Sequence, residues 1–235
     1  MSAEILATLL IWLVAFLFST TCHEAAHALV AKLGGDATAY EGGQVTLDPI
    51  PHIRREPFGM LVVPILSFIL QGGGWMIGWA SAPYDPFWAA RHPRRAALMA
   101  LAGPGANLLI VLVATLIIQL GFHFGFLGEA SRLSLERVVL LPGGEASALT
   151  TFLSVLFSLN VLLFAFNLLP VPPLDGNAAV GGLLGDDLGR RWSAFWGQQG
   201  IPFIGLIVAW LIFYRFAFDL WRLSLSLLYS DLHWS

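Results

Sequence analysis

Long runs of apolar residues alternate with short polar connections along the chain. A helix needs roughly 20 apolar residues to cross the hydrocarbon core of a bilayer, and it satisfies its own backbone hydrogen bonds in lipid. The pattern therefore predicts an all-α polytopic membrane protein with about five or six hydrophobic segments. The apolar stretches cover residues 4–33, 58–80, 96–122, 151–169 and 201–229.

The connections between these stretches carry their own structural signals. Gly34–Gly35 follows the first apolar run and is typical of a helix C-terminus. Polar and apolar residues alternate over 43–48, which predicts a short β-like connection after the first helix. Residues 186–200 mix charges with aromatic side chains and suit a helix in the membrane interface. Since no linker divides the chain, residues 1–235 are expected to form a single integral-membrane domain.

Composition narrows the class of protein further. The chain is 57% hydrophobic and only 11% charged, whereas about a quarter of the residues in a soluble domain are charged. The net charge of −3 provides no basic surface for nucleic acid. Cys22 is the single cysteine, which excludes an intramolecular disulfide and a cysteine-rich metal site. Because arginines occur in nearly every connection, they do not settle the orientation in the membrane.

The first apolar run contains the pattern His23-Glu-Ala-Ala-His27. A spacing of four residues places both imidazoles on one face of a helix, where they can bind one zinc ion. Glu24 lies about 100° around the helix, where it can reach a zinc-bound water rather than the metal. The metal acidifies such a water, and Glu24 would take its proton as general base. The pattern therefore predicts peptide hydrolysis.

The position of the pattern matters, because five residues can also match by chance. Three ionisable residues within one turn of a hydrophobic helix each cost about 2.5 kcal/mol or more at the bilayer centre, and such residues are functional by default. A catalytic zinc usually takes three protein ligands. The two histidines therefore need a third ligand from elsewhere in the chain.

Asp175 is the candidate for this third ligand. It follows the helix-breaking sequence Pro170-Val-Pro-Pro173 and precedes Gly176, so its carboxylate is expected on a non-helical turn at membrane depth. Irregular backbone is tolerated there only when it is buried in protein or lines a wet cavity. The alternative is that Asp175 caps the helix that follows, and the two roles are compatible.

Asn107 and Asn167 are polar residues within the third and fourth apolar runs. An asparagine side chain can hydrogen-bond a substrate backbone or the oxyanion that forms near the metal. The alternative is a hydrogen bond that joins two helices. Both alternatives stay open for Asn167, whereas helix-to-helix contact is favoured for Asn107.

Three motifs carry a family resemblance: His23-Glu-Ala-Ala-His27, Gly103-Pro-Gly-Ala-Asn107 and Asn167-Leu-Leu-Pro-Val-Pro-Pro-Leu-Asp-Gly176. Together they resemble the site-2 protease family of intramembrane zinc metalloproteases. The resemblance implies one zinc ion held by His23, His27 and Asp175, with Glu24 as general base. It also implies cleavage within or beside a transmembrane segment of another membrane protein.

The chain also departs from that family's pattern. The segment from Val45 to His52 is similar to the one that follows the first family motif, but family members often have asparagine where Asp48 stands. They also have a tighter turn after His52, so no role is carried over to this histidine. Many relatives contain a PDZ or CBS domain, and the longest connection here is too short for either. Regulation through such a domain is therefore not expected.

The expected ligand set restricts the topology. If every apolar segment crosses the bilayer, the chain delivers Asp175 to the half opposite the two histidines. One segment must therefore fail to cross. Residues 58–80 are the candidate, because Pro64 and the glycines at 72–74 can turn the chain back.

The leading hypothesis is a multi-pass protein of the cell membrane that acts as a zinc endopeptidase. Its partners would be the lipid bilayer and a transmembrane protein substrate, without nucleic acid. The first alternative is a proteolytically inactive metal-binding membrane scaffold, against which the intact Glu24 argues. A zinc transporter is the second alternative, and it is disfavoured because intramembrane acidic residues are too few to form a relay.

Overall fold

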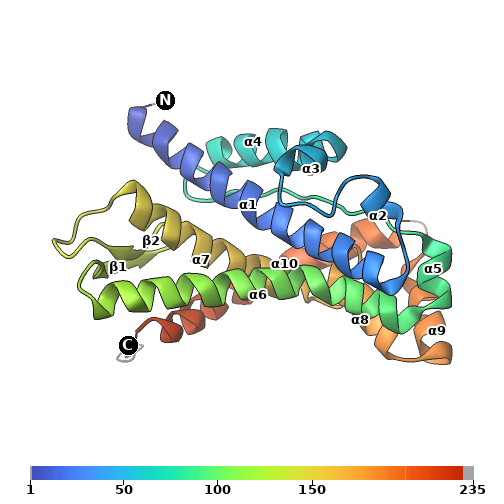
Figure 1. The fold of residues 1–235 in the computed structure, drawn as a ribbon. Coiled ribbons are helices and arrows are strands. Elements are labelled where there is room, and N and C mark those ends of the chain that lie inside the picture. Colours follow the sequence, from blue (N-terminus) through green and yellow to red (C-terminus); the bar gives the residue numbers. More distant parts are fainter. Residues whose placement is uncertain (1, 199, 230–235) are drawn as a thin grey trace.

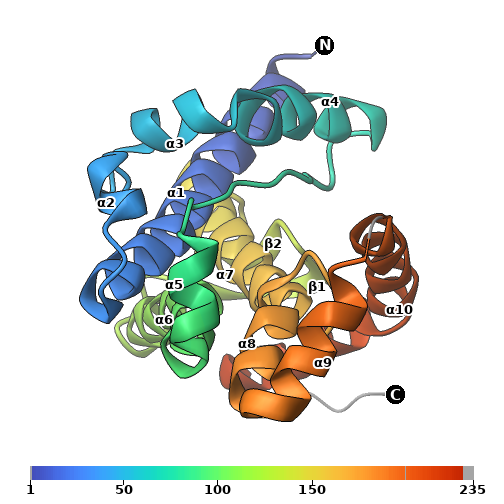
Figure 2. The same ribbon diagram turned by 90° about the vertical axis from the view of Figure 1, so that its right-hand side faces the viewer.

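The computed structural model describes residues 2–198 and 200–229, most of which are helical (Figure 1). In this part of the chain four helices are long and apolar enough to cross a membrane, which confirms the predicted all-α polytopic membrane protein. Helices α1, α6 and α7 lie side by side, and α10 packs against α7 (Figure 2). The four spans are α1 (Ala3–Gly34), α6 (Pro93–His123), α7 (Ala148–Asn167) and α10 (Ile201–Ser224), which continues into a 3₁₀ turn at Leu225–Leu227.

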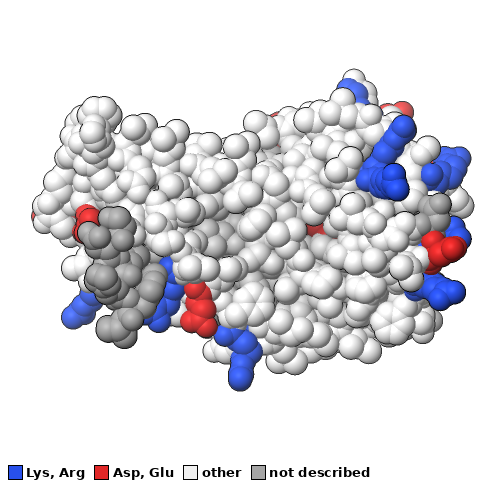
Figure 3. Space-filling view, turned by 90° about the horizontal axis from the view of Figure 1, so that it is seen from below, with Lys and Arg blue, Asp and Glu red and all other residues white. Residues whose placement is uncertain are grey.

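The outer surface of the spans is suited to lipid. On the face drawn in Figure 3, the Lys, Arg, Asp and Glu side chains gather towards the two ends, and the band between them is largely uncharged. Large apolar side chains on the spans are exposed, including Leu109, Leu116 and Leu211. In a bilayer such side chains face hydrocarbon. The chain is therefore a multi-pass integral membrane protein.

The first span has a defined start and stop. The Ser2 hydroxyl caps the N-terminus of α1 by accepting a hydrogen bond from the Ile5 amide. Gly35 ends the helix in the left-handed region at φ 100°, and its N–H donates to carbonyls of the last turn. Glycine adopts this conformation without a steric penalty. The predicted stop at Gly34–Gly35 is confirmed.

The apolar segment 58–80 does not form one crossing helix. A π-helical turn (Phe58–Val62) leads into α4 (Val63–Leu70), and this helix is too short to span a membrane. Gly72 and Gly73, both with positive φ, then turn the chain. The rest of the segment is extended and returns past α1 towards the next helix (Figure 2). This agrees with the expectation that one apolar segment fails to cross.

The expected β-like connection at 43–48 is wrong, because these residues form turns and bends. The Asp48 carboxylate accepts a hydrogen bond from the Ile50 amide and caps the helix that follows, which competes with an extended ladder. The described residues instead form a two-stranded antiparallel sheet in the connection after α6, from β1 (Gly128–Ser134) and β2 (Arg137–Leu140). Ser154 of α7 accepts from the amides of Val138 and Val139, so α7 covers the outer edge of β2.

Short helices complete the ends of the bundle. The helix predicted within 186–200 is present as α9, which lies with α5 and α8 at the end where α1 stops (Figure 1). The short helices are α2 (Thr38–Glu41), α3 (Pro49–Arg55), α5 (Pro86–Arg91), α8 (Asp175–Leu183) and α9 (Asp186–Trp196).

The two larger apolar clusters lie away from those short helices, and a small third cluster joins Trp88 of α5 to α1 and α6. One cluster joins α6, α7, α10 and the hairpin around Phe157 and Trp221. A second cluster joins the first half of α1 to α4 and α7 around Trp12 and Phe16. Trp12 also donates a 2.6 Å hydrogen bond from Nε1 to the Glu136 carboxylate at the hairpin turn. The hairpin is thereby tied to α1 as well as to α7.

Candidate active site

The predicted histidine pair lies buried in the second half of α1. His23 and His27 are each 7% exposed, and their Nε2 atoms lie 3.0 Å apart. Glu24 is 5% exposed, and one ligand atom from each of the three residues lies within 4.8 Å of the others. The helix thus gathers two imidazoles and a carboxylate in one place inside a membrane span.

The structure brings Asp175 to the same place. Its Oδ2 atom lies 3.1 Å from the Nε2 atom of His23, and its Oδ1 atom lies 3.3 Å from the Nε2 atom of His27. Asp175 is 152 residues away from His23 in the sequence. An ionised carboxylate is the form that ligates a metal.

Glycines let α8 deliver Asp175 to this position. A Cβ atom on Gly182 would lie 2.2 Å from the Pro93 carbonyl and 2.7 Å from the Ala97 Cβ atom, so α8 packs directly on the backbone of α6. A Cβ atom on Gly176 would lie 2.3 Å from the Leu168 carbonyl oxygen. Only glycine permits approaches this close. The sequence between α7 and α8 therefore fixes where the carboxylate lies.

Helix α6 forms the wall behind the histidines. A Cβ atom on Gly103 would lie 2.3 Å from the Nε2 atom of His27 and 2.5 Å from that of His23. Pro104 lies inside the helix and has no N–H, so a carbonyl one turn earlier loses its helical donor. Near this turn the Met99 carbonyl oxygen lies 2.7 Å from the Nδ1 atom of His27. This contact orients the imidazole, and its Nε2 atom faces Asp175.

Asn107 contacts the other histidine. Its Oδ1 atom lies 2.6 Å from the Nδ1 atom of His23, and its amide donates a 2.8 Å hydrogen bond to the Oδ1 atom of Asn160. Both ends of the Asn107 amide are engaged, and the side chain is fully buried. The geometry therefore favours contact between helices over an oxyanion role. Asn160 was not singled out from the sequence, although it is an asparagine within the fourth apolar run, as Asn167 is.

Asn167 lies at the last residue of α7 and is partly buried. Its amide donates a 3.0 Å hydrogen bond to the Leu163 carbonyl of its own helix. Among the described residues it makes no hydrogen bond to the histidines or to Asp175. Its position therefore leaves both alternatives open.

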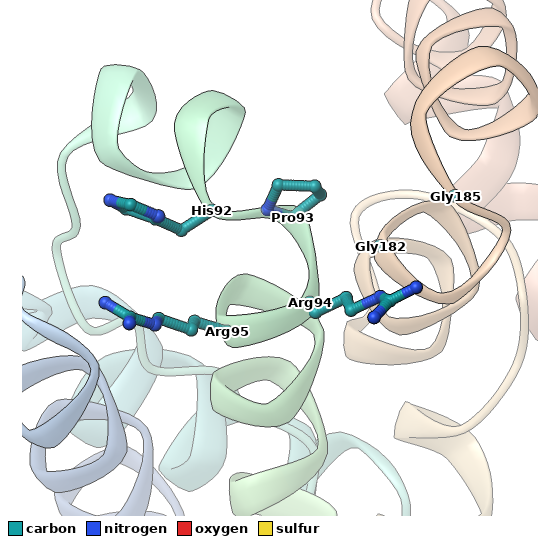
Figure 4. Close-up of a pocket in the computed structure, with 6 residues that line it drawn as sticks. All are labelled: His92, Pro93, Arg94, Arg95, Gly182 and Gly185. Atoms are coloured by element: carbon teal, nitrogen blue, oxygen red, sulfur yellow. The ribbon is translucent and has the colours of Figure 1, made fainter.

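A separate cavity of about 320 Å³ lies at the start of α6. It is lined by His92, Pro93, Arg94, Arg95, Gly182 and Gly185 (Figure 4). Arg94 points towards the two glycines, whereas His92 and Arg95 point to the opposite side. None of the lining residues belongs to the histidine and carboxylate cluster, so the cavity is not part of this site.

Comparison with known proteins identifies the family. The model of peptidase family M50 matches residues 11–212, and the chain belongs to this family. The match agrees with the resemblance to site-2 proteases that the three sequence motifs carry. No solved structure matches the chain.

Curated relatives point in the same direction. The chain is 33% identical to "Putative zinc metalloprotease YwhC" of Bacillus subtilis over 164 residues, which cover 69% of this chain and 64% of that protein. It is 32% identical to Rip2 of Mycobacterium tuberculosis and 28% identical to Rip2 of Mycolicibacterium smegmatis, over 70% of this chain and 54% of each relative. The aligned region thus spans between half and two thirds of these relatives. Their names and the family support zinc as the cofactor.

Proposed function

We propose that this chain is an intramembrane zinc endopeptidase that hydrolyses peptide bonds within or near transmembrane segments of other membrane proteins. The observation that carries the proposal is the convergence of His23, His27 and Asp175 beside Glu24, inside a membrane-spanning helix. In this proposal residues 1–235 act as one integral-membrane metalloprotease domain.

The donor atoms fit a zinc ion. Ligand atoms bound about 2.0–2.2 Å from one zinc lie about 3.3 Å apart at the corners of a tetrahedron. The two Nε2 atoms and the Asp175 oxygens are separated by 3.0, 3.1 and 3.3 Å. His23, His27 and Asp175 would therefore hold the ion with little movement. When bound, zinc would supply a Lewis acid that acidifies water and polarises a peptide carbonyl.

Glu24 is the proposed general base. It lies close to the histidines but makes no hydrogen bond to them among the described residues, which leaves its carboxylate available to a water. It would accept a proton from the attacking water and deliver it to the leaving amine. At 5% exposure, this carboxylate is shielded from bulk water.

The depth of the site supports a transmembrane substrate. His27 lies seven residues before the end of α1 at Gly34, which is about 10 Å along the helix. A peptide must therefore enter the bundle to reach the proposed base. Asn167 is a candidate for hydrogen-bonding the backbone of that peptide, because its helix ends eight residues before Asp175.

The variant Glu24→Gln tests the mechanism. In proteoliposomes with a model transmembrane peptide, this variant should retain zinc and lose cleavage by on the order of a thousandfold or more. Glu145→Gln, an exposed acid in the loop after β2, is the control and should cleave normally. Cleavage by Glu24→Gln at the wild-type rate would contradict the proposed mechanism.

The variant Asp175→Ala tests the ligand set. It should lower the zinc content of the purified protein, measured by mass spectrometry of the metal, whereas Asp187→Ala in exposed α9 should not. Zinc bound at full occupancy without Asp175 would exclude this carboxylate as a ligand. Zinc bound by the wild type without cleavage of any transmembrane peptide would favour the inactive scaffold.

A further inference from the structure

A chain of buried polar side chains runs from His23 across three helices. The Asn107 Oδ1 atom of α6 lies 2.6 Å from the Nδ1 atom of His23, and the Asn107 amide donates to the Oδ1 atom of Asn160 on α7 at 2.8 Å. The Asn160 amide donates to the Oγ atom of Ser19, also at 2.8 Å, which returns the chain to α1. Asn107, Asn160 and Ser19 are fully buried. We call these three residues the polar relay.

Two backbone carbonyls fix the direction of every bond in the relay. The Asn160 amide also donates to the Leu156 carbonyl at 2.8 Å, and the Ser19 hydroxyl donates to the Ala15 carbonyl at 2.7 Å. A carbonyl oxygen only accepts hydrogen bonds. The NH₂ group of Asn160 must therefore face Leu156 and Ser19, so its oxygen must face Asn107.

The same reasoning extends to the histidine. Because the oxygen of Asn160 accepts, the NH₂ group of Asn107 must face it, and the oxygen of Asn107 must face His23. The Nδ1 atom of His23 therefore has to carry the proton and donate. In a neutral imidazole the other nitrogen is then an acceptor. The lone pair of Nε2 consequently faces His27 and Asp175, where the metal is proposed to bind.

We propose that Asn107, Asn160 and Ser19 are positioning residues that set the tautomer and orientation of His23 for metal binding. The proposal rests on the proposed function, because it takes His23 as a zinc ligand. If the relay were reversed, the NH₂ group of Asn107 would face Nδ1. The proton of His23 would then reside on Nε2 and block the ligand position.

The two histidines obtain their orientation in different ways. His27 contacts a backbone carbonyl, that of Met99, which no substitution of a neighbouring side chain removes. His23 depends on side chains alone, and the last of them, Ser19, is one turn away on its own helix. A change at Asn160 should therefore alter the orientation of the His23 imidazole and leave that of His27 unchanged.

A merely structural role makes a different prediction. Hydrogen bonds between membrane helices contribute little stability on average, whereas loss of a group that orients a metal-bound histidine typically lowers metal affinity by about 10–100-fold. If the relay were only a contact between helices, its removal would shift unfolding and leave the zinc affinity of the folded protein unchanged.

The test compares Asn160→Leu with Ser158→Ala in the full-length protein in detergent. Both changes remove a buried polar side chain from α7, but Ser158 accepts a hydrogen bond from Trp221 and has no link to His23. Asn160→Leu should lower zinc affinity by about 10–100-fold, measured by competition with a chelator. Ser158→Ala should bind zinc as the wild type does.

Nitrogen NMR of ¹⁵N-histidine-labelled, metal-free protein provides a second readout. His23 should carry its proton on Nδ1 in the wild type and show both tautomers in Asn160→Leu, while His27 stays unchanged. Asn107→Asp should restore affinity relative to Asn107→Leu, since a carboxylate oxygen can also accept the hydrogen bond from the Nδ1 atom of His23. If Asn160→Leu does not fold, Ser19→Ala carries the same comparison with a smaller expected loss.

The outcomes separate this proposal from the proposed function. Wild-type zinc affinity together with an unchanged His23 tautomer in Asn160→Leu would overturn the relay and leave the protease proposal standing. A wild-type protein that binds no zinc would overturn the protease proposal and the metal-positioning role with it. Loss of zinc affinity in Asn160→Leu but not in Ser158→Ala, with a changed tautomer, would support both.

Discussion

The two ends of the α1, α6 and α7 bundle differ in the kinds of side chain that they bury. Towards the end where α1 stops, many buried side chains are polar and the helices approach through glycine, beside one small apolar cluster of Ala31, Trp88 and Met99. Towards the hairpin, the same three helices meet through large apolar side chains. The buried polar residues of the first region include Ser19, His23, Glu24, His27, Asn107 and Asn160. The apolar region includes Trp12, Phe16, Ile118, Val138 and Phe157.

This difference suggests that one end fixes the geometry of the site and the other end contributes most of the stability of the fold. Buried polar groups are tolerated in a span only when each finds a partner, so they impose directions and distances on the helices around them. Apolar packing is less directional and scales with the area that is buried. Substitutions at the site end should therefore disturb metal binding first, and substitutions at the hairpin end should disturb folding first.

Among the variants that test this comparison, the largest effect is expected for Gly103→Ala. The new Cβ atom would lie 2.3 Å from the Nε2 atom of His27, where a ligand atom has to face the metal. Zinc affinity and cleavage should each fall by about 100-fold or more, since small displacements at a reacting centre have effects of this size. Gly105→Ala on the same helix is the control, because its Cβ atom meets nothing within 4 Å. Normal zinc binding by Gly103→Ala would contradict the view that close helix approach at this end controls metal binding.

Phe157→Ala probes the apolar end. This side chain is fully buried in the cluster that joins α6, α7 and the hairpin. Its removal should lower the free energy of unfolding by about 3–5 kcal/mol, measured by denaturant titration in mixed micelles, while the protein that remains folded binds zinc normally. Leu116→Ala, at an exposed position on α6, should change stability by less than about 0.5 kcal/mol. Equal effects from the two variants would contradict the assignment of this core.

Trp12→Phe tests the polar tie between α1 and the hairpin. It removes the Nε1–H donor that bonds Glu136 at 2.6 Å and leaves a partly buried carboxylate without this partner. The expected cost is about 1–3 kcal/mol of stability, read from the thermal midpoint, with cleavage retained. Glu136→Gln should cost less, because an amide oxygen can still accept the bond. A loss of zinc in Trp12→Phe would show that the two ends are coupled.

The smallest effect is a pH dependence at Asp36, just beyond the end of α1. Burial raises the pKa of this carboxyl, but hydrogen bonds from Thr38 and from the Asp85 amide outweigh it and hold the pKa below its ordinary value. A lowered pKa in the folded state adds stability above the unfolded pKa, and this stability is lost as pH falls through the folded pKa. Asp36→Asn should therefore be less stable than wild type at neutral pH, and the difference should shrink below about pH 4.

Thermal midpoints of both proteins between about pH 6 and about pH 3 check this sign. Glu41→Gln, an exposed neighbour, serves as the control and should follow the wild type. A difference that grows as the pH falls would contradict the role of Asp36.

Local patterns predicted the spans well. Each of the four is an apolar run of helical length, and the stop of α1 follows a pair of glycines whose conformation depends on neighbouring residues alone. The pair His23 and His27 could be placed on one helical face for the same reason, since the period of an α-helix is a local property.

Short alternating segments were predicted poorly. Residues 43–48 alternate but end at an aspartate that caps a helix, whereas the observed hairpin lies in the connection after α6, where no strand was predicted. A two-stranded sheet is marginal without support. Here α7 and Tyr229, which donates to the Val138 carbonyl, supply that support from distant parts of the chain.

The sequence by itself determined four spans, the position of the histidine pair and a short list of polar residues inside apolar runs, because each depends on chemistry within a few residues. Only the tertiary structure decided that Asp175 lies 3.1 Å from His23, and that Asn160 rather than Asn167 joins the histidine through Asn107. Those pairs are separated by many tens of residues. Their contacts depend on how closely glycines let whole helices approach, and no local pattern records that distance.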